Sequence, residues 1–115
     1  MENFCRMKEL YRIVQQLELA VQQAHGLSVS ECLTMCNIKN GTHSASELAD
    51  NLSQSKSRIS KILSGLEKKG LIQRKFDDKD KRKTIFAFTS LGQEKAAEVE
   101  KSTVNFPDVQ IDCKS

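Results

Sequence analysis

The sequence predicts a mostly α-helical domain of the α+β class that carries one short β-hairpin. Two observations support this, and a third shows where basic charge is concentrated. Apolar residues recur every three or four positions over most of the chain, which is typical of amphipathic helices. Residues 71–76 and 84–88 look like two short strands joined by a polar loop, which indicates a hairpin. Residues 53–83 carry 11 Lys and Arg against 4 Asp and Glu, whereas the other residues carry 7 against 11.

Length and composition set the broad class. A chain of 115 residues is predicted to form one domain. No apolar run approaches the ~18 residues that a membrane span requires. Charged residues occur throughout positions 1–26, which is unlike a signal peptide. These features predict a cytoplasmic protein without membrane contact, in which cysteines are expected to be free thiols.

The first predicted element is a helix over residues 2–25. Its apolar positions include Phe4, Met7, Tyr11 and Val14, which recur at helical spacing. A helix of 24 residues is about 36 Å long, which is more than a compact domain of this size needs to cover itself. We therefore predict that it contacts a second subunit, although amphipathicity alone also permits a helix that lies only on its own domain.

Two further helices are predicted next. The second ends near Lys39, and its inward residues are expected to be Val29, Cys32, Leu33 and Cys36. A third helix opens at a capping box, Ser44-x-x-Glu47. A short turn over residues 51–54 then leads into a fourth helix, so the third and fourth together predict a helix-turn-helix unit.

The fourth helix has one apolar face and a polar, basic remainder. Ile59, Ile62, Leu63 and Leu66 recur at helical spacing, and Gly70 follows Lys68 and Lys69, a common way to end a helix. A basic helix followed by a basic hairpin suits double-stranded DNA. The helix can enter the major groove while the hairpin reaches the backbone or the minor groove.

The chain ends with a predicted helix over residues 89–104, after which Pro107 breaks the pattern. The predicted organisation is a single domain over 1–104, which comprises a dimerisation helix (2–25), a DNA-binding core (28–88) and the C-terminal helix (89–104). Residues 105–115 are predicted to be a flexible tail.

An ordered series of short motifs resembles the winged helix-turn-helix of MarR-family transcription regulators. The series is Leu48-Ala49, Leu66-Glu67, Gly70-Leu71, Arg74, Asp80, Arg82, Phe88-Thr89 and Gly92. The resemblance covers roughly residues 27–98, and Phe88 departs from the usual leucine. It implies a two-stranded wing, a short flanking strand at Thr42-His43, and a homodimer that regulates transcription from an inverted-repeat operator. Such relatives usually close the dimer with long C-terminal helices, whereas the last helix here is short.

The candidate DNA-binding residues fall into two groups. In the fourth helix they are Gln54, Ser55, Lys56, Ser57, Arg58 and Lys61, among which Gln and Arg can read bases while Ser and Lys mostly contact phosphates. In the wing they are Lys75, Lys79, Lys81, Arg82 and Lys83. The resemblance implies that Arg82 reaches the minor groove and that Asp80 holds either Arg74 or the loop in a structural role.

Other functions find less support in the sequence. Cys32 and Cys36 lie one helical turn apart with His25 and His43 elsewhere in the chain, but we interpret the two cysteines as core residues and predict no metal site. Cys5 is a weak candidate for a redox role. No catalytic constellation is present, so neither an enzyme nor a cofactor is predicted, and no effector can be assigned. The alternative to a DNA-binding regulator is a winged-helix protein-interaction module.

Overall fold

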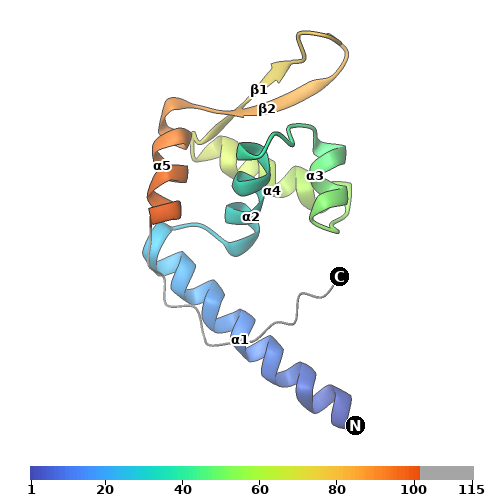
Figure 1. Cartoon of the computed structure of the whole chain (residues 1–115), viewed down its shortest axis with the longest axis vertical. Helices are drawn as coiled ribbons and strands as arrows, with labels where there is room; N and C mark the ends of the chain where they lie inside the picture. Colours follow the sequence, from blue (N-terminus) through green and yellow to red (C-terminus); the bar gives the residue numbers. More distant parts are fainter. Residues whose placement is uncertain (102–115) are drawn as a thin grey trace. The chain divides into compact units, whose positions relative to one another are not determined.

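The computed structural model describes residues 1–101, which form five helices and a two-stranded sheet (Figure 1). The elements are α1 (Glu2–His25), α2 (Val29–Lys39), α3 (Ala45–Asn51), α4 (Lys56–Lys68), β1 (Ile72–Phe76), β2 (Thr84–Phe88) and α5 (Ser90–Lys101). The mostly α-helical fold with a long first helix and a two-stranded wing is confirmed. The predicted end of the last helix at Val104 and the predicted tail, residues 105–115, lie outside the described residues.

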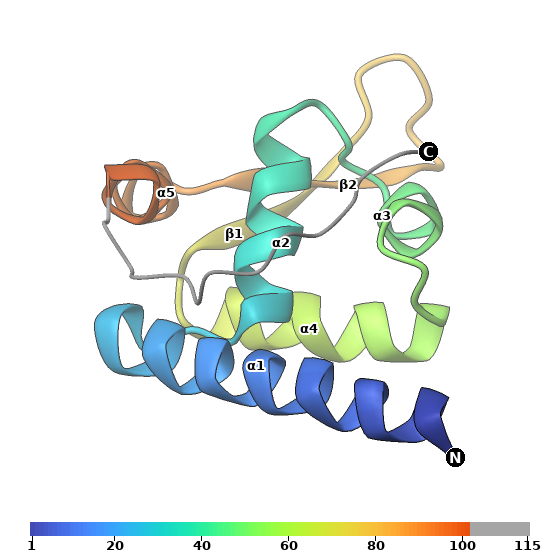
Figure 2. The same ribbon diagram turned by 60° about the horizontal axis from the view of Figure 1, so that its bottom comes forward.

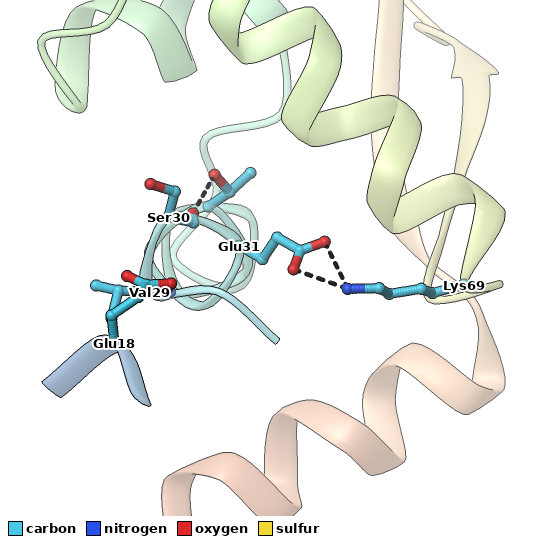
Figure 3. Close-up of polar contacts among 6 residues, drawn as sticks. Glu18, Val29, Ser30, Glu31 and Lys69 are labelled. Atoms are coloured by element: carbon cyan, nitrogen blue, oxygen red, sulfur yellow. Dashed lines mark hydrogen bonds and ion pairs between the residues drawn. The ribbon is translucent and has the colours of Figure 1, made fainter. Parts of the chain in front are cut away.

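Residues 1–29 form a compact unit of their own. It consists of α1 and the turn that follows, where Gly26 adopts a left-handed conformation (φ +68°) and its N–H donates to the Gln22 carbonyl. Only a residue that tolerates positive φ ends a helix this way without strain, and glycine does so best. Within this unit the Glu18 carboxylate accepts a hydrogen bond from the Val29 N–H at 3.1 Å (Figure 3).

Residues 30–101 form the second unit, which contains the rest of the helices and the hairpin. Its buried apolar residues come from α2, α3, α4 and the hairpin and make one core: Met35, Ile38, Leu48, Ala49, Ile59, Leu63, Leu66, Leu71, Ile72 and Phe86. The largest fully buried side chains include three residues of α4, because its apolar face points into this core. The opposite face of α4 is left to solvent.

The two strands are antiparallel, with Ile72 opposite Phe88 and Phe76 opposite Thr84. The predicted short strand at Thr42-His43 is wrong, since the sheet of the described residues has two strands. This segment nevertheless contacts β2, because the His43 carbonyl accepts a hydrogen bond from the Phe86 N–H at 2.9 Å. A single bond of this kind ties the segment before α3 to β2 without forming a strand.

The predicted inward face of α2 is wrong. Leu33 and Cys36 are exposed and Cys32 is only partly buried. The buried positions of α2 are instead Glu31, Thr34, Met35 and Ile38. The buried stripe is therefore rotated relative to the one that hydrophobicity predicts, and two of its four members are polar.

The two polar residues can be buried because each has a hydrogen-bond partner. The Glu31 carboxylate accepts from Lys69 Nζ at 2.8 and 3.0 Å (Figure 3). A Cβ at Gly65 of α4 would lie 3.3 Å from Glu31 Oε2, so the missing side chain of Gly65 leaves space for that carboxylate. The Thr34 hydroxyl donates to the Ser30 carbonyl at 2.8 Å. Burial of a hydrogen-bonded polar group is far less costly than burial of an unpaired one.

Candidate nucleic-acid interface

The helix-turn-helix consists of α3 and α4, and hydroxyl caps fix where each helix begins. Ser44 Oγ accepts from the Glu47 N–H at 3.2 Å, and Ser55 Oγ accepts from the Arg58 N–H at 3.1 Å. The predicted cap at Ser44 is confirmed, and Ser55 is the cap of α4. In the turn between the helices, the Gln54 N–H donates to the Ala49 carbonyl at 2.9 Å, which sets the angle at which α4 leaves.

The exposed face of α4 begins at this cap. Lys56, Ser57, Arg58 and Lys61 are all exposed, as is Ser55, and Gln54 is partly buried. None of these residues lies on the face that carries Ile59, Leu63 and Leu66. A helix whose first two turns expose cations and hydroxyls beside a buried apolar stripe can present those groups to a groove.

A tight loop, residues 77–83, joins the strands of the wing and is called the wing loop below. Two aspartates organise it. Asp77 Oδ1 accepts from the Lys79 N–H at 3.2 Å, and Asp80 Oδ1 accepts from the Arg82 N–H at 3.1 Å. Backbone bonds from Asp77 to Lys83 and from Lys83 to Asp80 close the loop. Asp80 was expected to hold either Arg74 or the loop, and its carboxylate bonds to the loop backbone.

Arg74 is held by a different group. Its Nε donates to both carboxylate oxygens of Glu67 at 3.0 and 3.1 Å, and its guanidinium lies 5.5 Å from the centre of the Phe86 ring. The arginine thereby links the end of α4 to the base of the hairpin. The Arg74–Glu67 pair explains why an acidic residue at 67 and an arginine at 74 occur together.

All five candidate residues of the wing are exposed: Lys75, Lys79, Lys81, Arg82 and Lys83. Lys83 is the member with a side-chain ion pair, since its Nζ lies 3.3 Å from Glu47 Oε1 of α3. Figures 1 and 2 both show the wing loop projecting away from the helices of the second unit. The structure thus separates the candidates into two places, the start of α4 and the projecting loop.

Two features of this region were missed by the sequence analysis. Phe76, at the end of β1, is 73% exposed although it looks like a core strand residue. The Asn51 amide donates to Asn37 Oδ1 and Thr42 Oγ1 at 3.4 and 3.2 Å, which ties α3 to α2. A strand that runs past the body of a domain exposes both faces at its far end. Alternation along the strand alone does not reveal where that end lies.

The described part of the chain, residues 1–101, contains no group of three or more His, Cys, Asp and Glu side chains that could hold a metal ion. None of its helices combines the length and the apolar character needed to cross a bilayer.

The fold has many counterparts among solved structures. AbsC from Streptomyces coelicolor, a MarR family transcriptional regulator, is 27% identical, with a TM-score of 0.73 over 85% of this chain and 68% of that one. A mutant MarR from E. coli complexed with operator DNA is 18% identical (TM-score 0.72; 84% and 72% of the two chains). A mutant MepR from S. aureus bound to an oligodeoxyribonucleotide is 17% identical (TM-score 0.65; 87% and 74%).

Sequence comparison assigns the family directly. No curated protein sequence matches this chain significantly. The MarR family model, however, matches residues 27–84, which is half of the chain and includes the helix-turn-helix, β1 and the wing loop. The described winged helix and this match lead to the same conclusion: the chain belongs to the MarR family.

Proposed function

We propose that this protein is a transcription regulator that binds double-stranded DNA sequence-specifically, as a homodimer on an inverted-repeat operator in the cytoplasm. The observation that carries the proposal is the arrangement of the candidate residues. Exposed cations and hydroxyls occupy the first two turns of α4, and exposed cations occupy the projecting wing loop. The family membership and the DNA-bound state of the MarR and MepR mutants agree with this use of the two elements.

The two elements have different roles in this proposal. α4 lies in the major groove, where Gln54 and Arg58 face base edges while Lys56 and Lys61 contact phosphates. The wing loop reaches the neighbouring minor groove with Arg82, and Lys79 and Lys81 lie near the backbone. Asp80 and Arg74 support the wing structurally, through the loop hydrogen bond and the Glu67 pair.

The dimer in this proposal is built from α1. Phe4, Met7, Tyr11 and Val14 lie on one face of that helix and are between 53% and 67% exposed. We call these four residues the α1 stripe. A run of large apolar side chains left in water along a helix is typical of an interaction surface. Two copies joined there would present two helix-turn-helix units to two half-sites.

Binding titrations of three variants at several salt concentrations test the division between anchoring and reading. Lys81→Ala should weaken binding to all DNA similarly and reduce the slope of log K against log salt by about 0.9. Arg58→Ala should cost about 1–3 kcal/mol on the preferred site and little on random DNA. Arg82→Ala should weaken binding most, with a bias against A·T-rich flanks.

The preferred site itself comes from selection of bound sequences from a random DNA pool. If Arg82→Ala bound DNA as tightly as the parent, the wing would not be part of the DNA interface. If all three variants and the parent bound DNA only weakly, and without salt dependence, the chain would instead fit a protein-interaction module.

A further inference from the structure

Two of the cysteines form a cluster that the proposed function does not use. Cys32 and Cys36 lie one turn apart on α2 and both line a small hollow between α2 and α5. Met35, Ala96 and Val99 form its apolar wall, and the ion pair between Lys39 and Glu100 lies at the same hollow. Neither thiol is in a disulfide, and Cys36 is exposed while Cys32 is partly buried. We call the two residues the thiol pair.

The spacing of the thiol pair determines which chemistry suits it. Side chains four residues apart on a helix have their Cβ atoms about 5–6 Å apart. A disulfide needs Cβ atoms about 3.5–4.5 Å apart, so a direct S–S bond would distort α2. A single soft atom that bonds to each sulfur at roughly 2.3 Å, as zinc–thiolate bonds do, spans the wider gap without moving the backbone.

The surroundings favour a small, soft ligand. The Asn40 side-chain amide is a hydrogen-bond donor that lies 3.8 Å from Cys36 Sγ, so this sulfur already has a polar neighbour. The hollow has a volume of about 70 Å³. This is room for roughly five water molecules and is well below the ~300 Å³ of a pocket for a drug-sized ligand. Zinc normally requires four protein ligands in a structural site, and residues 1–101 offer no group of three.

We propose that Cys32 and Cys36 form a two-thiolate site for a soft, thiophilic ligand, either a monosubstituted trivalent arsenical or a monovalent copper ion. With an arylarsine oxide, two As–S bonds form, and the arsenic-bound oxygen leaves as water with the two thiol protons. With Cu(I), two Cu–S bonds form and two protons pass to solvent. Neither reaction changes an oxidation state. Soft thiolates select both ligands over harder cations.

Phenylarsine oxide and intact-mass spectrometry test the arsenical arm. The variant Cys5→Ser, Cys113→Ser keeps the thiol pair, and the variant Cys32→Ser, Cys36→Ser keeps an equal number of thiols elsewhere. The first should retain one phenylarsenic group per chain in excess monothiol and release it to a dithiol. The second should lose it to monothiol, because it lacks the thiol pair. Since Cys36 is exposed, Cys36→Ser alone on the first background preserves folding and should also lose the group.

Anaerobic competition against a Cu(I) chelator tests the copper arm with the same variants. One Cu(I) per chain held by the first variant and not by the second supports a general soft site. Retention of the arsenical alone supports the site and restricts its ligand to trivalent arsenic. Equal retention by both double variants, or retention of neither probe by the first, would overturn the proposal. None of these outcomes depends on DNA binding.

Discussion

Close contacts of Thr89 and Gly92 join the start of α5 to Gly70 and Leu71, the residues that precede β1. The Thr89 N–H donates to the Leu71 carbonyl, and the Thr89 hydroxyl both donates to the Gly70 carbonyl and accepts from the Gly92 N–H. Gly92 is buried in the first turn of α5. A Cβ built there would lie 1.8 Å from the Leu71 carbonyl oxygen. The Thr-x-x-Gly motif therefore combines a helix cap with a contact that no side chain permits.

Gly92→Ala should accordingly destabilise the fold. The backbone of Leu71 cannot yield as a flexible side chain would, so α5 must move, at a cost of about 3 kcal/mol or more. Chemical denaturation followed by circular dichroism measures it. Glu94→Ala, an exposed substitution in the same helix, is the control and should change the free energy of unfolding by about 0.5 kcal/mol or less. A Gly92→Ala protein as stable as the control would mean that this contact is loose.

Glu31 is the second residue whose environment has a measurable consequence. Its side chain is 11% exposed and its partner Lys69 is 42% exposed. Removal of one member of a fully buried pair costs about 3–5 kcal/mol, but Lys69 can turn to water. Glu31→Ala should therefore lower the free energy of unfolding by about 1–3 kcal/mol in urea denaturation.

An exposed pair provides the comparison. Glu9 lies 3.6 Å from Arg12 on α1, and the two side chains are 70% and 67% exposed. Glu9→Ala should cost about 0.5 kcal/mol or less, because exposed pairs of this kind contribute little. If the two glutamate variants were equally stable, the buried position of Glu31 would have no energetic significance.

At the scale of the element, sequence periodicity predicted α4 and the hairpin well and α2 poorly. In α4 every buried position is aliphatic, so hydrophobic spacing identifies its inner face directly. In α2 the inner face contains Glu31 and Thr34, and their burial depends on Lys69 and the Ser30 carbonyl. The lysine is 38 positions away. Local pattern cannot reveal such a partner, so Cys32 and Cys36 were wrongly placed in the core.

The wing is a second element in which contacts between distant residues decide the structure. The sequence predicted its loop residues, its basic character and a structural role for Asp80 and Arg74. The partner of Arg74 was not evident, since Glu67 lies on another element. The chain turns at Gly70, just after α4, where φ is +75°, and this turn brings Arg74 back to Glu67. The exposed Phe76 likewise depends on how far β1 extends past the core.

Asp80→Ala tests whether loop geometry matters more than charge. Removal of a carboxylate from a DNA-binding loop should strengthen binding if charge alone decides affinity. Asp80, however, accepts the hydrogen bond that positions the Arg82 backbone. We expect Asp80→Ala to weaken DNA binding several-fold in fluorescence anisotropy titrations, because Arg82 is no longer held.

Two companion variants separate the causes. Asp78 is exposed in the same loop, so Asp78→Ala should strengthen binding slightly through its charge. Asp80→Asn keeps an oxygen acceptor while it removes the charge, and should restore most of the affinity. A gain in affinity for Asp80→Ala equal to that of Asp78→Ala would show that the loop needs no such support.

At the scale of the whole molecule, charge and apolar surface are divided between different parts of the chain. The basic excess lies in residues 53–83, whereas the α1 stripe is apolar and exposed. Such a division suits a protein that binds DNA through one part of the chain and a second copy of itself through another. The stripe was evident from helical spacing, but its exposure was not, because an amphipathic helix has the same pattern whether its partner is its own chain or another.

Val14→Asp should therefore abolish the proposed dimer. Val14 lies in the stripe and is 53% exposed in the single chain, so the substitution leaves the monomer intact. In the dimer it would bury an unpaired carboxylate, at a cost of about 3 kcal/mol or more, which raises the dissociation constant by about 100-fold. Sedimentation velocity over a range of micromolar concentrations measures this shift.

Leu19 provides a control on the same helix. It is 64% exposed, but it lies about 100° around the helix from the middle of the stripe and so outside it. Leu19→Asp should leave the dissociation constant within a few-fold of the parent. Because a dimer spans two half-sites, Val14→Asp should also bind full operator no better than an isolated half-site, while Leu19→Asp keeps the preference. A monomeric parent, or equal weakening by both variants, would rule out the α1 stripe as the interface.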